Sequence, residues 1–337
     1  MLLPPLPPNF DAALRDSEAR DGKWRLAAAL RLATAPEGRE GEACRALVVL
    51  ANDSLGPIRE SALRSLETLG EPGGLAVAKR RMDDEHDAVR QAALRAAAAI
   101  DEDALEWLPE MARDPRPEMR AQAVLAVAEL AGGEQALPVL RRALGDDDSR
   151  VRGAAAVAVG ELGLGDLDDT LTDMLDDAPE VAFAAAAALA DLGDARGEPV
   201  LIAALRDREA GLDAAEALGE IATETGLEAL AYTAQRTFAP LLLKAAAGAA
   251  LAKRGDARGE PALGRVLTAW RADGRDYAVH AVGELGLVGL VPALVALAKR
   301  LRGADPRVLA DALERFAEER EDAGRALGLL REKHAVA

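Results

Sequence analysis

The sequence is poor in aromatic residues, and it has one cysteine. Phe, Trp and Tyr make up 3% of the 337 residues, and Cys44 stands alone. A single cysteine excludes an internal disulfide and gives no sign of an oxidising compartment. A β-sandwich or α/β core would need more aromatic and β-branched residues. The longest uncharged apolar run near a predicted helix, Val181 to Ala190, is far shorter than the roughly 20 residues that span a bilayer. We therefore expect a soluble, cytoplasmic, all-helical protein.

Motifs that carry chemistry are also missing. The three histidines (His86, His280 and His334) are far apart and show no HExxH spacing. One cysteine cannot build a Cys-based zinc site within one chain. There is no GxxxxGK[ST] loop and no GxSxG motif. We therefore predict no catalytic residue, no metal, no cofactor and no enzymatic activity.

Charge is unevenly distributed. The chain has 41 basic and 58 acidic residues, for a net charge of −17. Residues 101–194 hold 22 of the acids and 7 of the basic residues, whereas the remainder is nearly neutral. The negative electrostatic field of this acidic middle segment repels nucleic acid and favours a basic partner. A need for solubility alone could also explain the excess of acids.

The sequence contains an internal repeat. Ten related segments follow one another at intervals of 29 to 34 residues, and they begin at Trp24, Ile58, Val89, Met119, Val151, Val181, Ala210, Leu243, Gly274 and Val308. In each segment the small or apolar residues lie at offsets 0, 3, 4, 7, 8 and 11, which is one face of an α-helix. Each segment is therefore predicted to be a helix, here called helix B.

A second helix, helix A, is predicted before each helix B. Its early prolines suit a first helical turn, and a glycine at offset 12 suits the left-handed cap that ends helix B. The prolines are Pro138, Pro199, Pro261 and Pro292, and the glycines are Gly70, Gly163, Gly193, Gly255 and Gly286. One helix pair cannot bury both apolar faces, so neighbouring pairs must stack. The predicted fold is an all-α solenoid of about ten helix pairs.

The repeat D-x4-[VIM]-R-x-x-A-x-x-A-x-x-x-L-G resembles the HEAT-like repeats first described in phycobilin lyases. The resemblance covers nearly the whole chain after the first twenty residues. We predict a Pro-rich arm and cap at 1–20, a solenoid at 21–322 and a C-terminal capping helix at 323–337. Within the solenoid, residues 41–194 are regular and 195–322 are divergent. The resemblance leaves open a bilin-lyase-like chaperone or transferase subunit. It also leaves open a HEAT-like DNA glycosylase, which the acidic charge disfavours.

An Asp and an Arg recur at fixed positions in the regular repeats. The Asp lies five residues before the start of helix B and the Arg one residue after it; the residues are Asp53, Asp84, Asp114, Asp146 and Asp176, with Arg59, Arg90, Arg120 and Arg152. We predict that these side chains form a ladder between adjacent repeats. From Ala182 onward the ladder pattern breaks down.

A row of carboxylates is predicted on helix B. At offset 10 the chain has Glu129, Glu161, Asp191, Glu220 and Glu284, with Lys253 interrupting the row and Glu318 extending it. Helix B usually lines the concave face in the folds that this repeat resembles. The small residues at offset 9 would leave room for a partner. We predict that the row binds a basic protein or peptide, with a merely solvated face as the alternative, and expect neither nucleic acid nor membrane as partner.

A second candidate surface is predicted in the divergent repeats, where aromatic residues replace small ones. Its members are Tyr232, Phe238, Trp270, Arg271, Arg275, Tyr277 and His280. They could form a docking surface, or they could be alternative packing that replaces the lost ladder.

Overall fold

The computed structural model describes residues 10–300 and 303–334, and residues 1–9 of the predicted Pro-rich arm lie outside them. These residues form α-helices joined by turns, with no strand among them. The chain divides into two compact units, Met1–Leu162 and Gly163–Ala337. The predicted change from regular to divergent repeats at 194/195 falls inside the second unit.

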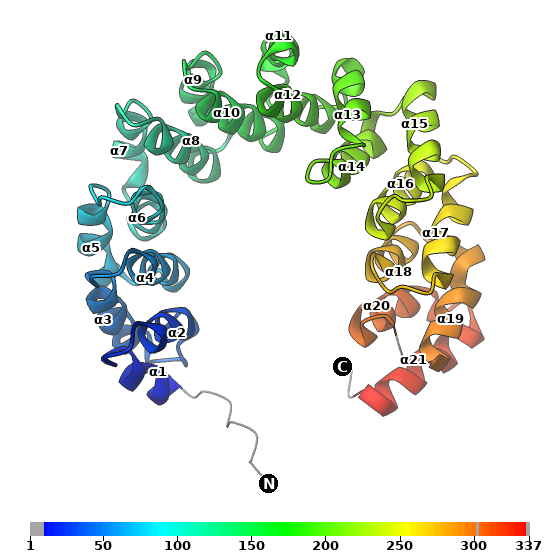
Figure 1. Ribbon diagram of the computed structural model, residues 1–337, viewed down its shortest axis with the longest axis horizontal. Helices are drawn as coiled ribbons and strands as arrows, with labels where there is room; N and C mark the ends of the chain where they lie inside the picture. The colour runs from blue at the N-terminus through cyan, green and yellow to red at the C-terminus, as the bar shows by residue number, and fades with distance from the viewer. Residues whose placement is uncertain (1–9, 301–302, 335–337) are drawn as a thin grey trace. The chain divides into compact units, whose positions relative to one another are not determined.

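Unit 1 is a stack of five helix pairs (Figure 1). Its helices are α1 (Phe10–Asp16), α2 (Gly22–Leu32), α3 (Glu40–Leu50), α4 (Gly56–Leu69), α5 (Leu75–Arg81), α6 (Asp87–Ile100), α7 (Ala104–Met111), α8 (Pro117–Ala131), α9 (Gly133–Ala143) and α10 (Ser149–Glu161).

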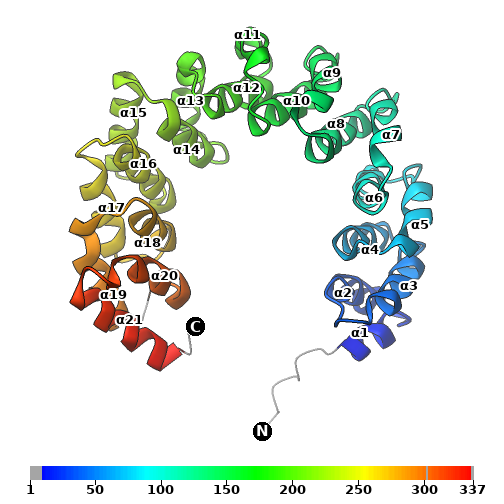
Figure 2. The ribbon, with the colours of Figure 1, turned by 180° about the vertical axis from the view of Figure 1, so that it is seen from behind.

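Unit 2 adds five more pairs and one further helix (Figure 2). Its helices are α11 (Asp168–Asp173), α12 (Pro179–Asp191), α13 (Glu198–Ala204), α14 (Gly211–Ile221), α15 (Glu224–Gln235), α16 (Leu241–Lys253), α17 (Gly259–Thr268), α18 (Arg275–Glu284), α19 (Val291–Arg300), α20 (Pro306–Ala317) and α21 (Glu321–His334). The ten pairs confirm the predicted solenoid.

Within each unit, the first and second helices of the pairs form two separate layers (Figures 1 and 2). The odd-numbered helices correspond to helix A and the even-numbered ones to helix B. We call the surface of the second layer the B face. In unit 1 it is formed by α2, α4, α6, α8 and α10, and in unit 2 by α12, α14, α16, α18 and α20.

Glycine ends the B helices where the sequence predicts it. All five glycines at offset 12 have a positive φ, between 63° at Gly286 and 77° at Gly193, the region in which a Cβ would be strained. The prolines follow the prediction less closely. Pro199 and Pro292 lie at the second position of their helices, whereas Pro138 lies inside α9 and not in its first turn.

Small residues let neighbouring helices approach closely. A Cβ on Gly259, at the start of α17, would lie 2.3 Å from the backbone nitrogen of Ala252 in α16. The glycines at offset 9 serve the same purpose on the B face. Gly219 abuts Ala250, and Gly283 abuts Ala312, each on the next helix B. At these two positions the next helix B therefore occupies part of the space that was predicted to be free for a partner.

The Asp–Arg ladder is confirmed in unit 1, where it joins adjacent repeats. Arg59 binds Asp84 of the next repeat through Nε and Nη2, at 2.9 and 2.8 Å. Arg120 binds Asp146 in the same way, at 2.9 and 2.6 Å. The remaining nitrogen, Nη1, donates to the carbonyl of the ladder Asp in the same repeat, such as Asp53. Each rung thus fixes a turn and bridges to its neighbour.

One rung differs from the predicted pattern, and another follows it but was not predicted. Arg90 pairs with Glu118, because Arg116 occupies both oxygens of Asp114. The first rung was missed in the sequence: Arg25 binds Asp53 at 2.6 Å. Arg25 directly follows the Trp24 that begins the first repeat, so the same spacing rule could have found it.

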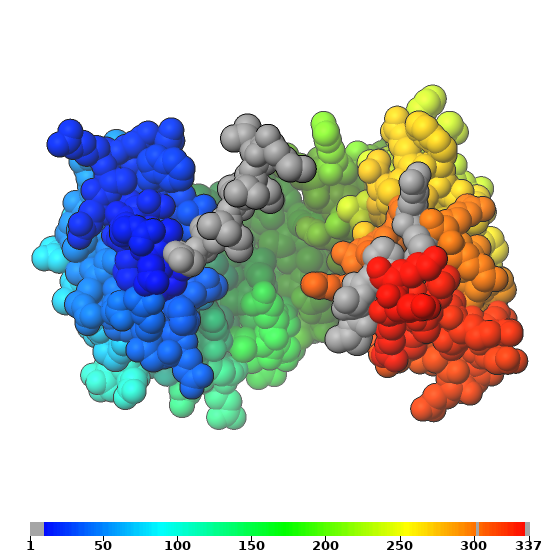
Figure 3. Space-filling view, turned by 90° about the horizontal axis from the view of Figure 1, so that it is seen from below, coloured from blue at the N-terminus to red at the C-terminus, as the bar shows by residue number. Residues whose placement is uncertain are grey.

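The ends of the stack are covered by helices. Residues 10–16 of the predicted arm form α1, which packs on α2. At the other end α21 starts at Glu321, two residues earlier than predicted, and buries Ala323, Leu327 and Leu330 against α19 and α20. Figure 3 shows α21 in red on the terminal surface of unit 2. It therefore shields apolar surface that a further repeat would otherwise cover.

Candidate binding site

The carboxylate row lies on the B helices, and all five of its predicted acids are exposed. In unit 1 the row includes Glu129 on α8 and Glu161 at the end of α10. In unit 2 it includes Asp191 at the end of α12, Glu220 on α14 and Glu284 at the end of α18. The predicted helical position is therefore correct in both units.

A hollow of about 450 Å³ opens on the B face of unit 2, and we call it the tyrosine hollow. It lies over α16, between α14 and α18. Its lining residues are Glu216, Gly219 and Glu220 of α14, Ala246, Ala249, Ala250 and Lys253 of α16, and Tyr277, His280, Ala281, Glu284 and Leu285 at α18. It thus combines two acids of the row with two members of the second predicted surface.

The alanines of α16 make this hollow possible. Ala246, Ala249 and Ala250 carry only methyl groups, so the middle helix does not fill the space between its neighbours. Tyr277 reaches across α16 and donates its phenol proton to Oε1 of Glu216 at 2.9 Å. The pKa of Tyr277 is raised far above its usual range, mainly by burial and to a smaller extent by this hydrogen bond. The phenol therefore stays a neutral donor at physiological pH.

The acids of the hollow differ in how well they are neutralised. Glu220 forms an ion pair with Lys253, and Glu284 forms one with Arg315 of α20. Glu216 accepts only the neutral phenol among the contacts of the described residues. The hollow therefore retains negative charge while offering an apolar floor.

The charge of Glu220 on the next helix B influences Asp191, a neighbouring member of the row. The pKa of Asp191 is raised, first because its carboxylate is partly desolvated and then because of the charge of Glu220. An added cation near these two side chains would relieve this repulsion.

Unit 1 has a related hollow of about 410 Å³ over α6, between α4 and α8. Gln122, Glu129 and Leu130 of α8 line it at the same repeat positions as Tyr277, Glu284 and Leu285 in the tyrosine hollow. The difference lies in the middle helix, where Arg95 pairs with Glu67 across the hollow. Two of the five predicted row positions, Glu129 and Glu284, thus line equivalent hollows.

The second predicted surface does not form one cluster. Tyr277 and His280 belong to the tyrosine hollow on the B face. Tyr232 lies on α15, a helix A, and Phe238, Trp270 and Arg271 lie in the turns between helices A and B. The periodicity of the sequence predicts which face of its own helix a residue lies on. It does not predict which faces of different helices lie close together, so the predicted cluster was not correct.

Arg275 is buried and serves the fold, so it is not part of a docking surface. Its guanidinium donates to the carbonyl of Gly303 at 2.6 Å and to those of Ala269 and Arg271 at 2.5 and 3.1 Å. It fastens the turn before α18 to the next repeat, where a ladder rung would otherwise lie.

One group of side chains among the described residues has the spacing of metal ligands: Asp84, Glu85 and His86. Arg59 pairs with Asp84 at 2.8 Å and with Glu85 at 3.3 Å. Because these carboxylates already neutralise an arginine, we assign no metal to them. Over the described residues, every helix is too short or too polar to cross a membrane.

Comparisons with known proteins address the fold. The family model described as HEAT repeats matches residues 79–160 and 104–181. No curated protein matches the sequence significantly.

Several solved structures resemble the chain at low identity. The Escherichia coli protein YibA is 21% identical over 73% of this chain and 92% of its own, with a TM-score of 0.45. The complex of CpcE and CpcF of phycocyanin lyase from Nostoc is 20% identical over 78% and 97%, with a TM-score of 0.39. Kap121p bound to Pho4p is 14% identical over 99% and 45%, with a TM-score of 0.45. We draw no functional conclusion from similarities at this level.

The helix pairs, their regular spacing and the family match agree with one another. Residues 79–181 match HEAT repeats, and the described residues of both units have the helix pairs of an α-solenoid.

Proposed function

We propose that this chain is a non-enzymatic, cytoplasmic scaffold that binds a basic segment of another protein on its B face. The observation that carries the proposal is the tyrosine hollow, in which the carboxylates of Glu216, Glu220 and Glu284 surround an alanine floor. The carboxylate row predicted from the sequence supplies further negative charge around the hollow. In unit 2 this charge includes Asp191, whose pKa is influenced by Glu220.

The chemistry of the hollow suits a lysine or arginine side chain. Such a side chain has an apolar stem, which the methyl groups of Ala246 and Ala249 can cover. Its charged head can donate hydrogen bonds to Glu216, and the ring of Tyr277 offers a face for a cation. A basic segment would also place further cations near the rest of the row.

The hollow over α6 supports a second, independent contact in unit 1. Glu129 lines it at the repeat position of Glu284. Because Arg95 already pairs with Glu67 there, we expect this hollow to bind a basic side chain more weakly than the tyrosine hollow does.

The test is a binding titration with a fluorescent peptide rich in arginine and leucine, followed by anisotropy. We compare the full chain with the double variant Glu216→Gln and Glu284→Gln. The control is Glu319→Gln with Glu332→Gln, which removes two exposed carboxylates of the same unit outside the hollow.

We expect the hollow variant to weaken binding about tenfold, since a charge-assisted hydrogen bond contributes about 1.5–3 kcal/mol and solvent exposure reduces it. The control should change affinity by less than about twofold, and salt should weaken binding to the unmodified chain. Equal affinity for both variants would show that the tyrosine hollow is not the binding site.

A further inference from the structure

Unit 2 carries a second surface of opposite character along the turns that follow α13 and α15. Two adjoining hollows, of about 430 and 250 Å³, share Arg206 and Arg236 in their linings. We call this surface the arginine groove. The residues on which the inference depends are Ile202, Arg206, Arg208, Tyr232, Arg236 and Leu242.

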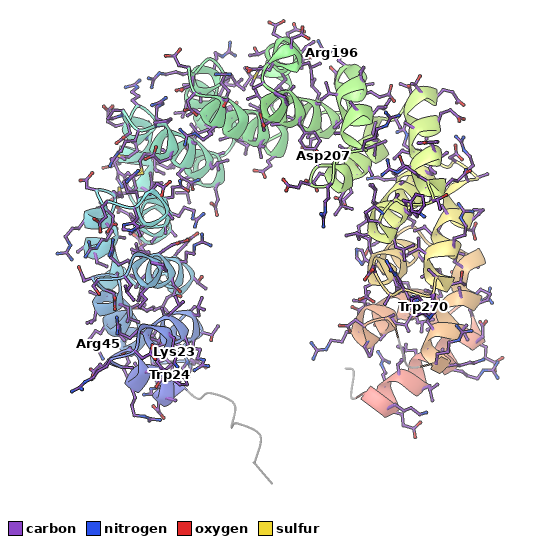
Figure 4. All side chains as sticks on the ribbon, in the orientation of Figure 1. Lys23, Trp24, Arg45, Arg196, Asp207 and Trp270 are labelled. Carbon is purple, nitrogen blue, oxygen red and sulfur yellow. The ribbon has the colours of Figure 1, made fainter. Side chains whose placement is uncertain are left out.

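The groove carries three arginines, Arg206, Arg208 and Arg236. Arg206 and Arg208 are exposed and Arg236 is half-buried. None of these guanidinium groups forms an ion pair within the part of the chain that the structure describes. Asp207 lies between the first two, in the turn after α13 (Figure 4), but its carboxylate accepts the backbone N–H groups of Glu209 and Ala210 at 2.7 and 3.0 Å. Both hydrogen bonds go to Oδ1, so this oxygen of Asp207 is held in the turn.

The ladder aspartate is absent from both turns of the groove. The repeat position held in unit 1 by Asp53 and Asp84 is occupied here by Leu205 and Phe238. Leu205 is buried, so it replaces the ladder aspartate by apolar packing. Phe238 is 96% exposed, so packing within the chain does not account for it.

Aromatic side chains extend the groove beyond its arginines. Tyr232 lines it and is 62% exposed. Trp270, in the next turn (Figure 4), is 95% exposed. That turn lies against the start of α16, because Gly274 contacts the backbone of Leu242. Exposed aromatic residues beside arginines are typical of the central part of protein–protein interfaces.

We propose that the arginine groove binds an acidic segment of a partner protein that also carries apolar side chains. Carboxylates of the segment pair with Arg206, Arg208 and Arg236, and its apolar side chains cover Ile202 and Leu242. This surface shares no lining residue with the tyrosine hollow, and it takes a ligand of opposite charge. Nucleic acid fits less well, since the chain has a net charge of −17 and the groove walls are largely aliphatic.

The probe is a labelled peptide composed of glutamate, leucine and phenylalanine, titrated into the full chain and followed by anisotropy. The test variant replaces Arg206, Arg208 and Arg236 by Gln. The matched control replaces the exposed Arg45, Arg80 and Arg141 of unit 1 by Gln, which removes the same charge elsewhere. We expect at least about a tenfold loss of affinity in the test variant and less than about twofold in the control.

A second variant separates docking from charge attraction alone. Tyr232→Ser should weaken binding of the peptide severalfold without changing its salt dependence, because it removes an exposed aromatic ring that lines the groove and no charge. A chain with Trp24→Phe and Trp107→Phe retains Trp270 as its single tryptophan. Its emission should shift to shorter wavelength when the peptide binds.

Several results would overturn the proposal. The glutamine version of the peptide could bind equally well, or the control variant could lose as much affinity as the test variant. Inorganic phosphate or a single-stranded oligonucleotide could bind at the arginines while the peptide does not. Self-association that the test variant abolishes, without peptide binding, would identify a second copy of this chain as the occupant.

Discussion

Replacing Asp84 by Ala should destabilise the repeats around α4 and α6 more than any exposed charge change in unit 1. The Arg59 and Asp84 side chains are 5% and 1% exposed. Asp84 accepts two hydrogen bonds from Arg59, one from Arg81 at 3.2 Å and one from the backbone of His86 at 3.1 Å. Truncation leaves a buried guanidinium without its main partner.

The expected cost follows from those contacts. Removing one member of a buried ion pair costs about 3–5 kcal/mol. Glu85 lies 3.3 Å from Arg59 and is mostly exposed, so it can replace part of the lost interaction. We therefore expect a loss near the lower end, about 3 kcal/mol. The matched control is Glu60→Ala, on the same helix as Arg59, whose partly exposed pair with Arg64 contributes at most about 1 kcal/mol.

Urea denaturation of the full chain, followed by far-UV circular dichroism, compares the two variants. Because repeat proteins can unfold in more than one step, hydrogen exchange with mass spectrometry should locate the loss of protection to α4 and α6. If Asp84→Ala and Glu60→Ala shift the transition equally, the ladder does not stabilise unit 1 in the way we infer.

Three other predictions follow from the same structure. Hydrogen bonds, from Arg25 to Asp53 and from Arg120 to Asp146, are the main cause of the lowered pKa of each aspartate. The stabilisation that these two ion pairs contribute should be present above pH of about 4 and should be lost as pH falls through the pKa of the folded state. Urea denaturation midpoints measured between about pH 6 and 3 test this, and constant midpoints would contradict it. Gly259→Ala should lower the free energy of unfolding by about 1–3 kcal/mol in thermal denaturation, because the added Cβ would clash with α16. In the control Gly328→Ala, on α21, the added Cβ meets open space. An equal loss of stability in the two variants would refute the clash. Lys253→Ala should tighten the arginine-rich peptide severalfold, since Lys253 neutralises Glu220 in the tyrosine hollow; weaker binding would show that this lysine helps to form the site.

The sequence alone determined the helix pairs and the turns that join them. The apolar period of helix B, the glycine that ends it and the Asp–Arg spacing are local patterns, and physical chemistry within about one repeat fixes their outcome. The exposed row at offset 10 is of the same kind, so Glu129 and Glu284 could be placed on the B face without coordinates.

Only the tertiary structure decided where those residues form a site. The hydrogen bond from Tyr277 to Glu216 joins residues 61 positions apart, and it exists because the intervening α16 has alanines there. Gly219 and Gly283 proved to be contacts between B helices, and Tyr232 lies on a helix of the other layer. Such outcomes depend on the volume that neighbouring helices fill, which periodicity within one helix does not specify.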